Sequence, residues 1–284
     1  MNPPVRLGRV ALLGTGLIGG SLAAALKRHG LAQPIVGFSG GDAADALALG
    51  LVDEVARSVE EAVAGCDTVI LAAPVSVNCE LIARIAPVLS PGVLVTDVSS
   101  VKMPVVEAAL RHLGDALPGF VPCHPIAGGE RSGPEAADAR LFERRTVIVS
   151  PLPGSEAGGV ALLEAVWKRL GATVLRMDPE EHDRVYALVS HWPHAVAFAL
   201  AAAVSRGDVG DGLIGQGLLD LTRTAASSPA LWADILLQNA RPVLDAGEQV
   251  AREISSIRQA IEAGDRDALI GLFSEAADWR RRLG

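Results

Sequence analysis

Short apolar runs rich in β-branched residues alternate with stretches of helical periodicity over the first part of the chain. Most of these runs lack alternating polar positions, which is typical of strands covered on both faces. The runs lie at residues 9–14, 34–39, 68–74, 93–99, 120–125, 145–151 and 173–177. Because strands that alternate with helices are joined by right-handed crossovers, the pattern predicts a largely parallel sheet with helices on its faces.

The pattern changes where a long helical stretch begins at Asp178. This residue is the expected N-cap, Pro179 occupies the first helical position, and Glu181 completes a capping box. Beyond this stretch we find only helical periodicity. We therefore predict two domains, an α/β domain over residues 1–178 and an all-α domain over residues 179–284.

A glycine-rich segment, GTGLIGGSLA, follows the first predicted strand and opens the first predicted helix. In such a loop Gly14 allows a tight turn, Gly16 lets the backbone approach a pyrophosphate, and Gly19 packs the helix on the strand. The helix N-terminus then faces the phosphates. A plain glycine turn is the alternative, but the strand before and the helix after favour a dinucleotide site. We predict a Rossmann-type NAD(P)-binding domain whose loop contributes Gly14, Gly16, Leu17, Ile18 and Gly19.

The end of the second predicted strand bears on the choice of cofactor. Ser39 lies about twenty residues beyond Gly19, where a carboxylate commonly binds the ribose. Without a carboxylate nothing repels a 2′-phosphate, and a serine hydroxyl beside glycine amides can bind phosphate oxygens. No arginine follows Ser39, however, and Asp42 can reach the ribose if the loop folds back. NADP is therefore favoured as the cofactor, and NAD stays open as the alternative.

Polar residues follow the later predicted strands, at the edge of an open α/β sheet where ligands bind. His124 ends the strand at 120–125 and precedes Pro125 and a glycine pair, so we predict a functional rather than a structural histidine. The residues expected beside the cofactor at this edge are Ala73, Pro74 and Ser99. Further polar residues there are Ser100, Lys102, Glu130 and Arg131.

In the helical half, SHWPH places His191 and His194 three positions apart on one helical face. Pro193 between them removes a backbone hydrogen bond and should kink the helix. Core histidines beside a kink are one alternative. A metal pair is another, but no HExxH motif or acidic third ligand supports it. Further along, Asp220 and Arg223 are candidates for substrate binding, with a solvated ion pair as the alternative.

Composition narrows the class of protein. The formal charge of −8 over 284 residues disfavours nucleic acid as a partner. No uninterrupted apolar stretch reaches the roughly 20 residues that a membrane span needs, and the N-terminus resembles no signal peptide. Three widely spaced cysteines without a CxxC pair fit a reducing compartment. We expect a soluble cytoplasmic protein that binds neither nucleic acid nor a membrane.

Six stretches together resemble the prephenate/arogenate (cyclohexadienyl) dehydrogenase family. They occur in order over most of the chain and read GTGLIGGSLA, LGLVDE, TDVSSVK, HPIAGGERSGPEAADARLF, SHWPHAVAF and DLTRTAASSPALWADI. This combination is far more specific than any one motif. The resemblance implies a Rossmann domain followed by an all-α dimerisation domain, with the active site in the cleft between them. The implied reaction is the oxidative decarboxylation of prephenate or arogenate on the route to tyrosine.

The resemblance also assigns roles to the matching residues. His124 would accept the proton of the substrate 4-hydroxyl, Ser100 would hydrogen-bond the same group, and Arg223 would grip a carboxylate. Hydride would leave C4 for the nicotinamide, and loss of the ring carboxylate as CO2 would make the ring aromatic. The remaining substrate-side residues are His191, His194, Glu130 and Asp220, the last of which is expected to orient Arg223.

Two other classes of protein stay open at this point. A β-hydroxyacid dehydrogenase also joins a Rossmann domain to a helical one, but it uses a lysine base in the helical domain. Here Lys27, Lys102 and Lys168 all precede residue 178, which argues against that class. The other is a regulator that binds NAD(P)H without turnover, and absorbance at 340 nm separates it from an enzyme. The preference for prephenate or arogenate, and the role of Trp192, stay undecided.

The helical half carries more apolar surface than a layer of its size would bury alone, for example in AVAFALAAAV and ALIGLF. A two-fold pairing is the commonest way to cover such a surface. We therefore expect a homodimer formed through the helical domain. If tyrosine inhibits the protein, we expect it to act at the active site, because no regulatory domain follows the helices.

Overall fold

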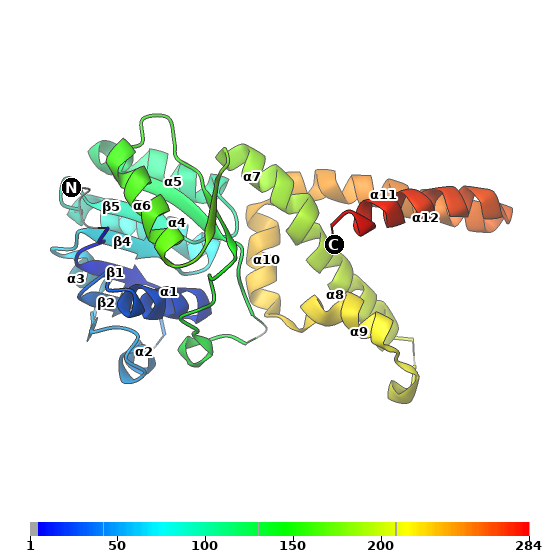
Figure 1. Cartoon of the computed structure of the whole chain (residues 1–284), viewed down its shortest axis with the longest axis horizontal. Coiled ribbons are helices and arrows are strands. Elements are labelled where there is room, and N and C mark those ends of the chain that lie inside the picture. The colour runs from blue at the N-terminus through cyan, green and yellow to red at the C-terminus, as the bar shows by residue number, and fades with distance from the viewer. Residues whose placement is uncertain (1–4, 42, 130, 208, 284) are drawn as a thin grey trace.

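In the described part of the chain, an eight-stranded sheet organises the N-terminal half (Figure 1). The computed structural model describes residues 5–41, 43–129, 131–207 and 209–283. The strand order is β3-β2-β1-β4-β5-β6-β7-β8, and neighbouring strands are parallel except β6 and β7. The chain order reverses between β1 and β4, and ligands bind in open α/β sheets outside such a switch point. The strands are β1 (Val10–Leu13), β2 (Ile35–Phe38), β3 (Glu54–Val55), β4 (Thr68–Leu71), β5 (Leu94–Asp97), β6 (Phe120–Pro125), β7 (Thr146–Val149) and β8 (Thr173–Arg176).

Every predicted apolar run contains a strand, so the prediction of a largely parallel α/β sheet is confirmed. The sequence pattern did not reveal β3, which is two exposed residues at the sheet edge and too short to form an apolar run. The antiparallel pairing of β6 with β7 also went unpredicted. Between them the described residues form only a short 3-10 turn, Pro134–Ala136, and no crossover helix that would return the chain in parallel.

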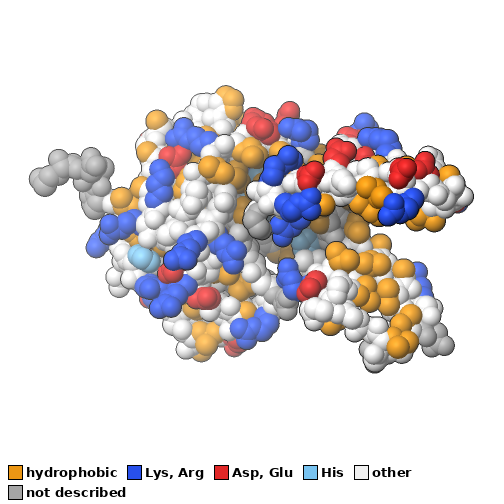
Figure 2. Space-filling view, turned by 45° about the vertical axis from the view of Figure 1, so that its right-hand side comes forward, with side chains coloured by type: hydrophobic (Ala, Val, Ile, Leu, Met, Phe, Trp, Pro, Cys, Tyr) orange, Lys and Arg blue, Asp and Glu red, His pale blue; other side chains and the backbone are white. Residues whose placement is uncertain are grey.

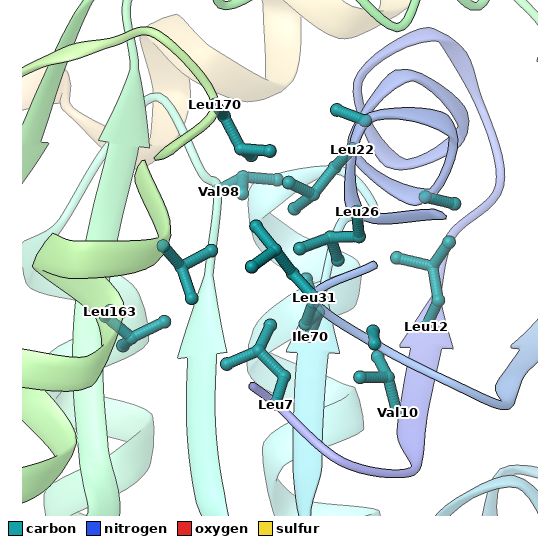
Figure 3. Close-up of a cluster of buried hydrophobic side chains, with 14 of the residues drawn as sticks. Leu7, Val10, Leu12, Leu22, Leu26, Leu31, Ile70, Val98, Leu163 and Leu170 are labelled. Carbon is teal, nitrogen blue, oxygen red and sulfur yellow. The ribbon is translucent and has the colours of Figure 1, made fainter. Parts of the chain in front are cut away.

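Two layers of helices cover the two faces of the sheet. Successive residues of a strand point to opposite faces, so Leu12 packs with Leu22 and Leu26 of α1 (Figure 3), whereas Leu13 belongs to the cluster on the other face. The first layer contains α1 (Leu17–Arg28) and α6 (Ala157–Arg169), and the second contains α3 (Val59–Val63), α4 (Val75–Ile85) and α5 (Met103–His112). The short α2 (Ala44–Ala48) lies near the sheet edge. Strands buried on both faces explain the continuous apolar runs in the sequence.

A long helical segment leaves the sheet after β8. It begins as α7 (Pro179–Tyr186), continues through a π-helical turn at Ala187–His191, and ends as α8 (Trp192–Ser205). The Asp178 side chain accepts hydrogen bonds from the first turn of α7, which confirms the predicted N-cap. The expected disruption by the proline at position 193 takes the form of this π turn. A π turn accommodates the missing backbone donor without ending the helical segment.

Of the remaining helices, α9 and α11 pack against this segment, and α10 packs against the first half of the molecule. Trp232 and Ile235 of α10 join the apolar cluster of the second helix layer, and the Ser76 N–H donates to Asp234 at 3.2 Å. These contacts seat α10 on α4 of the sheet-containing half. Helices α11 and α12 form a hairpin that extends away from the sheet (Figure 1). The bounds are α9 (Gln216–Thr222), α10 (Pro229–Gln238), α11 (Ala240–Ala263) and α12 (Arg266–Arg281), with 3-10 turns at Asp211–Leu213 and Arg223–Ala226.

Much of the apolar surface of the helical half is exposed in the single chain. Figure 2 shows hydrophobic side chains spread over this half. Exposed examples are Val189, Val196, Leu219, Leu244, Ile254, Ile270 and Phe273. The segment Pro179–Ser205 is long and apolar enough to cross a membrane by length and composition alone, a feature that the sequence reasoning missed. It also holds buried His182, Asp183 and His191, which hydrogen-bond within the protein, so its apolar surface fits a protein interface better.

Candidate active site

The glycine-rich loop between β1 and α1 forms a cradle that side chains could not occupy. Gly14 has φ of +109°, and a Cβ there would lie 2.5 Å from the backbone of Ala72. A Cβ at Gly19 would lie 2.0 Å from the carbonyl oxygen of Gly14, so only glycine lets α1 pack this close. At Gly16 nothing lies within 4 Å of the Cβ position, which leaves that backbone open to a ligand. The geometry therefore fits a dinucleotide pyrophosphate at the N-terminus of α1.

A cavity of about 480 Å³ opens beside this loop at the carboxyl ends of β1, β2 and β4. Its size is within the range of small-molecule and cofactor sites. The lining residues are Gly14, Thr15, Gly16, Phe38, Ser39, Gly40, Gly41, Ala72, Ala73, Pro74, Val77, Glu80, Leu81 and Arg84. The structure thus brings together the predicted Gly14, Gly16, Ser39, Ala73 and Pro74 in one pocket. It adds Glu80 and Arg84 from α4, which the sequence reasoning did not single out.

A buried amide holds one wall of this cavity. The Asn78 side chain is fully buried, accepts a hydrogen bond from Ala73 N–H at 3.1 Å, and donates to the Ala73 carbonyl at 2.9 Å. It also donates to the Ser99 hydroxyl at 2.9 Å. Ser99 therefore lies behind the wall, at 4% exposure, rather than among the residues that line the pocket. Leu17 and Ile18 likewise form the first turn of α1 without lining the pocket.

Lys102 lies fully buried between β5 and β6. Its Nζ is 2.5 Å from Asp97 Oδ2 and donates to the Cys123 carbonyl at 2.6 Å. Asp97 also accepts hydrogen bonds from the backbone N–H groups of Ser99 and Cys123. Because Lys102 binds Asp97 of β5 and the Cys123 carbonyl of β6, it holds the end of β6 in place just before His124.

His124 ends β6 with 9% of its surface exposed. Its Nδ1 lies 2.8 Å from Nε2 of His182, a residue of α7 in the helical half. The rings of His182 and Tyr186 pack against His124 with centroids 5.0 and 5.1 Å away. Burial lowers the pKa of His124 well below its usual value, and the nearby positive charges act in the same direction. His124 is therefore a neutral imidazole near pH 7, the form that accepts a proton.

The partner of His124 is itself held by a carboxylate. His182 Nδ1 lies 2.8 Å from Asp183 Oδ1, and Asp183 also accepts hydrogen bonds from Lys102 N–H and Met103 N–H, each at 2.7 Å. These two donors belong to the N-terminus of α5, so Asp183 joins the helical half to the sheet-containing half. Sequence reasoning missed His182 and Asp183, because adjacent polar residues in the first turns of a helix normally face solvent.

His191 and His194 share a helical face, as predicted, and both pack against Trp232, with ring centroids 6.3 and 3.5 Å away. His191 is only 1% exposed, and Nδ2 of Asn239 lies 3.0 Å from its Nδ1. Burial lowers the pKa of His191 to about 4. His194 is half-buried, and its Nδ1 donates to the carbonyl of Ser190 at 2.8 Å. His194 is thus the more accessible of the two histidines.

The remaining residues of the predicted substrate site are Arg223, Asp220, Ser100 and Glu130. Arg223 begins a 3-10 turn and is near enough for its charge to lower the pKa of His194 further, after the larger effect of burial. Asp220 accepts a hydrogen bond from Gln216 at 2.8 Å, along its own helix. Ser100 is partly exposed, three residues after the end of β5. Glu130 and Asp42 lie outside the described residues. Within those residues, no group of three His, Cys, Asp or Glu side chains is arranged to hold a metal ion.

Two family models match the chain and identify its protein family. Residues 22–176 match the family model described as "Prephenate dehydrogenase, nucleotide-binding domain", and residues 178–275 match "Prephenate dehydrogenase, dimerization domain". The chain belongs to the prephenate dehydrogenase family. Its first half is thus a Rossmann-type nucleotide-binding domain, and its helical half corresponds to the dimerisation domain of the family, as the sequence predicted.

Individual relatives agree with this assignment. The chain is 37% identical to prephenate dehydrogenase of Bacillus subtilis over 96% of its length and 76% of that protein. It is 36% identical to cyclohexadienyl dehydrogenase of Zymomonas mobilis, over 96% of this chain and 95% of that protein. The structure of prephenate dehydrogenase from Aquifex aeolicus in complex with hydroxyphenyl propionate and NAD+ matches all of both chains, with a TM-score of 0.88 and 32% identity. Members of the prephenate dehydrogenase family are NAD-dependent oxidoreductases, so the prediction that the protein is an enzyme is confirmed.

Proposed function

We propose that the protein catalyses the oxidative decarboxylation of prephenate, arogenate or both, giving 4-hydroxyphenylpyruvate or tyrosine in tyrosine biosynthesis. The observation that carries this proposal is His124, a neutral imidazole at the carboxyl end of β6, on the same edge of the sheet as a cavity that fits a dinucleotide. The names and identities of the relatives support the same substrate class. The cytoplasm is the compartment that fits such an enzyme.

Proton removal is the task of His124. With Nδ1 occupied by His182, the ring accepts the proton of the substrate 4-hydroxyl at Nε2. Ser100, which follows the neighbouring strand β5, would hydrogen-bond the same hydroxyl, as the family resemblance implies. A nicotinamide held in the cavity lined by Gly14, Gly16 and Ser39 would supply the acceptor for the hydride from C4. The ring carboxylate then leaves as CO2, its bonding electrons complete the aromatic ring, and the ring oxygen takes a proton back.

Substrate carboxylates need positive or donating groups, because the formal charge of the chain is −8. Arg223 offers a planar fork of donors that suits a carboxylate, and His194 lies beside it. We assign the carboxylate clamp to Arg223, with His194 lining the same side. Glu130, Asp220 and His191 complete the substrate-side set that we propose from the family resemblance.

The cofactor pocket supports NADP as the favoured cofactor, with NAD as the alternative. Ser39 places no carboxylate beside the ribose, and Arg84 of α4 lines the same pocket. Arg84 Nη2 lies 3.1 Å from Glu60 Oε1 in an exposed ion pair, which is weak enough for the arginine to reach a phosphate instead. Glu80 also lines the pocket, and its carboxylate favours the free ribose hydroxyl of NAD. Arg84 and Glu80 of α4 therefore have opposite effects on the preference for NADP over NAD.

We also propose a homodimer formed through the helical domain, and inhibition by tyrosine at the active site. The exposed apolar residues of α8, α11 and α12 supply the dimer surface. Tyrosine carries the aromatic ring of the products and would compete with substrate. The domain boundary that we use lies at residue 178, between the last strand and α7.

The function is tested by following absorbance at 340 nm with each pairing of prephenate or arogenate with NAD+ or NADP+. The proposal predicts turnover with at least one pairing, on the order of 1 to 1000 per second at saturation. Absence of reduction with all four pairings, in protein that binds NADPH, would favour a cofactor-sensing role.

A further inference from the structure

Three buried side chains from two domains form a continuous chain of hydrogen bonds, His124–His182–Asp183. The two links are each 2.8 Å long, and His182 has no exposed surface. Burying polar side chains costs free energy unless they are hydrogen-bonded, so these links are needed to keep all three residues buried. The order of donors and acceptors along the chain can be worked out from its carboxylate end.

Asp183 sets the direction of the chain. Both carboxylate oxygens act as acceptors, since Oδ1 receives Lys102 N–H and Oδ2 receives Met103 N–H. His182 Nδ1, 2.8 Å from Oδ1, must therefore carry a hydrogen and donate it. A neutral imidazole has one N–H and one lone pair, so Nε2 of His182 is left as an acceptor. Burial keeps His182 neutral by lowering its pKa, and this effect outweighs the opposing effect of Asp183.

The same rule fixes His124. Its Nδ1 faces the lone pair of His182 Nε2 and must donate, so the lone pair of neutral His124 is on Nε2. We propose that His182, held by Asp183, is a positioning residue that locks His124 in the tautomer whose Nε2 accepts the substrate proton. The inference rests on the proposed function. When His124 takes the proton, the positive charge lies two hydrogen bonds from the Asp183 carboxylate, which stabilises it.

The chain also couples catalysis to the contact between the domains. His124 belongs to the sheet, His182 and Asp183 belong to α7, and Asp183 is bound by the N-terminus of α5. Tyr186, one turn further along α7, stacks on His182 with ring centroids 4.5 Å apart. The ring of His182 is thus held by a stack as well as by hydrogen bonds. Its packing and its hydrogen bonding can be separated by substitution.

Two substitutions of His182 make this separation. His182→Phe keeps an aromatic ring against Tyr186 but removes the acceptor for His124 Nδ1–H. His182→Gln loses the ring but keeps a carbonyl acceptor for His124 and an N–H donor for Asp183. We expect His182→Phe to lower kcat by about 100- to 10000-fold, with KM nearly unchanged. This range covers the loss of a general base and the loss of the residue that orients it. His182→Gln should stay within about tenfold of the parent. A packing role predicts the opposite order, so a His182→Phe enzyme at least as active as His182→Gln would overturn the proposal.

The tautomer itself is measured by NMR, without turnover. In protein labelled with ¹⁵N-histidine, long-range ¹H–¹⁵N correlations distinguish Nδ1–H from Nε2–H rings, and His124→Asn assigns the signal. We expect His124 to carry its hydrogen on Nδ1 in the parent protein and to lose this preference in His182→Phe. A parent His124 with its hydrogen on Nε2 would refute the inference, whether or not the protein turns over prephenate. Absence of turnover with the expected tautomer would instead refute the proposed function alone.

Glu181→Gln is the matched control. It exchanges a carboxylate for an amide on the same turn of α7, but the side chain is exposed and outside the hydrogen-bonded chain. We expect parental kcat, KM and His124 tautomer in this variant. Asp183→Asn supplies a second disruption, because one amide oxygen cannot accept from Lys102 N–H, Met103 N–H and His182 together. It should lower kcat as His182→Phe does, and parental kcat in a folded Asp183→Asn protein would contradict the proposal.

Discussion

The imidazole ring of His194 stacks on the indole ring of Trp232, with ring centroids 3.5 Å apart and planes 19° from parallel. Trp232 belongs to α10, which is seated on α4 beside the cofactor cavity. The stack therefore fixes a histidine of α8 relative to the nucleotide-binding domain. With Nδ1 donating to Ser190, the Nε2 atom of His194 is left for a ligand. The proposed substrate side of the site is thus built on contacts between the domains.

Arg223→Gln should mainly raise KM for prephenate or arogenate. A hydrogen bond to a charged group contributes about 1.5–3 kcal/mol, so the expected increase is about 10- to 100-fold, with a smaller change in kcat. Steady-state kinetics with saturating cofactor measure it. Arg241→Gln, which removes an exposed arginine of α11 paired with Asp245, is the control and should leave KM unchanged. A large loss of kcat at constant KM would assign Arg223 to the chemical step instead.

Ser39→Asp should shift the cofactor preference toward NAD. A carboxylate beside a 2′-phosphate costs about 1–3 kcal/mol at an effective dielectric near 20, once screening is included. The ratio of kcat/KM for NADP to that for NAD should therefore fall by about ten- to a hundredfold. An unchanged ratio would show that Ser39 does not face the 2′ position, and Asp42 would become the better candidate.

Arg84→Gln tests the cation that the structure adds to this pocket. Loss of its charge should lower the same ratio by about tenfold, because charge-assisted hydrogen bonds to phosphate are stronger than neutral ones. Arg28→Gln removes an arginine paired with Glu143 away from the pocket and should leave the ratio unchanged. Equal effects of the two variants would show that Arg84 acts only through the overall charge.

Stability should fall as the pH drops below about 6.5, the value expected for an unfolded histidine. Burial lowers the pKa values of His124, His182 and His191 in the folded protein, the last to about 4. Below pH 6.5 the unfolded chain therefore binds more protons than the folded one. Each histidine adds up to about 1.4 kcal/mol to the free energy of unfolding for each pH unit as the pH rises toward 6.5. Above pH 6.5 its contribution no longer changes.

Urea unfolding between pH 5 and 8, at one protein concentration, measures the slope of the free energy of unfolding against pH. His191→Gln should make the slope smaller, because one of the histidines with a lowered pKa is gone. A free energy of unfolding that is constant or rises below pH 6.5 would contradict the burial of these neutral rings.

The dimer prediction concerns the exposed apolar residues of the helical domain. Light scattering at micromolar concentration should give the mass of two chains. Val196→Asp and Phe273→Asp, in α8 and α12, place charges on this surface and should favour the monomer. Leu47→Asp changes a similarly exposed residue of α2 in the nucleotide-binding domain and should leave the dimer intact. A monomeric parent protein would refute the prediction.

The sequence predicted those parts of the site that have a local pattern. The strand, glycine loop and helix around Gly14 are consecutive in the chain, and His124 follows directly from a strand end. His182, Asn78 and Arg84 carry no such pattern, because their roles depend on neighbours that are distant in sequence. Their detection required the positions of α4 and α7 relative to the sheet.

Some local predictions needed the fold for their final form. Pro193 was expected to kink its helix, and the structure shows a π turn over Ala187–His191, directly before the turn that contains the proline. His191 was expected to line the cleft; in the single chain it is 1% exposed and lies beside Asn239, the residue between α10 and α11. In both cases the helical periodicity was right, and the low exposure of His191 depends on tertiary packing that the sequence pattern does not contain. The roles assigned to the individual site residues stay predictions.

The central claim is that His124 is the base of a prephenate or arogenate dehydrogenase. A single-turnover experiment on parent and His124→Asn proteins, following reduced cofactor at 340 nm and aromatic product together, tests it most directly. The parent should form one aromatic product for each reduced cofactor. His124→Asn should lower the rate by about 100-fold or more with substrate binding nearly intact. Reduced cofactor without aromatic product in the parent, or an undiminished rate in His124→Asn, would contradict the claim.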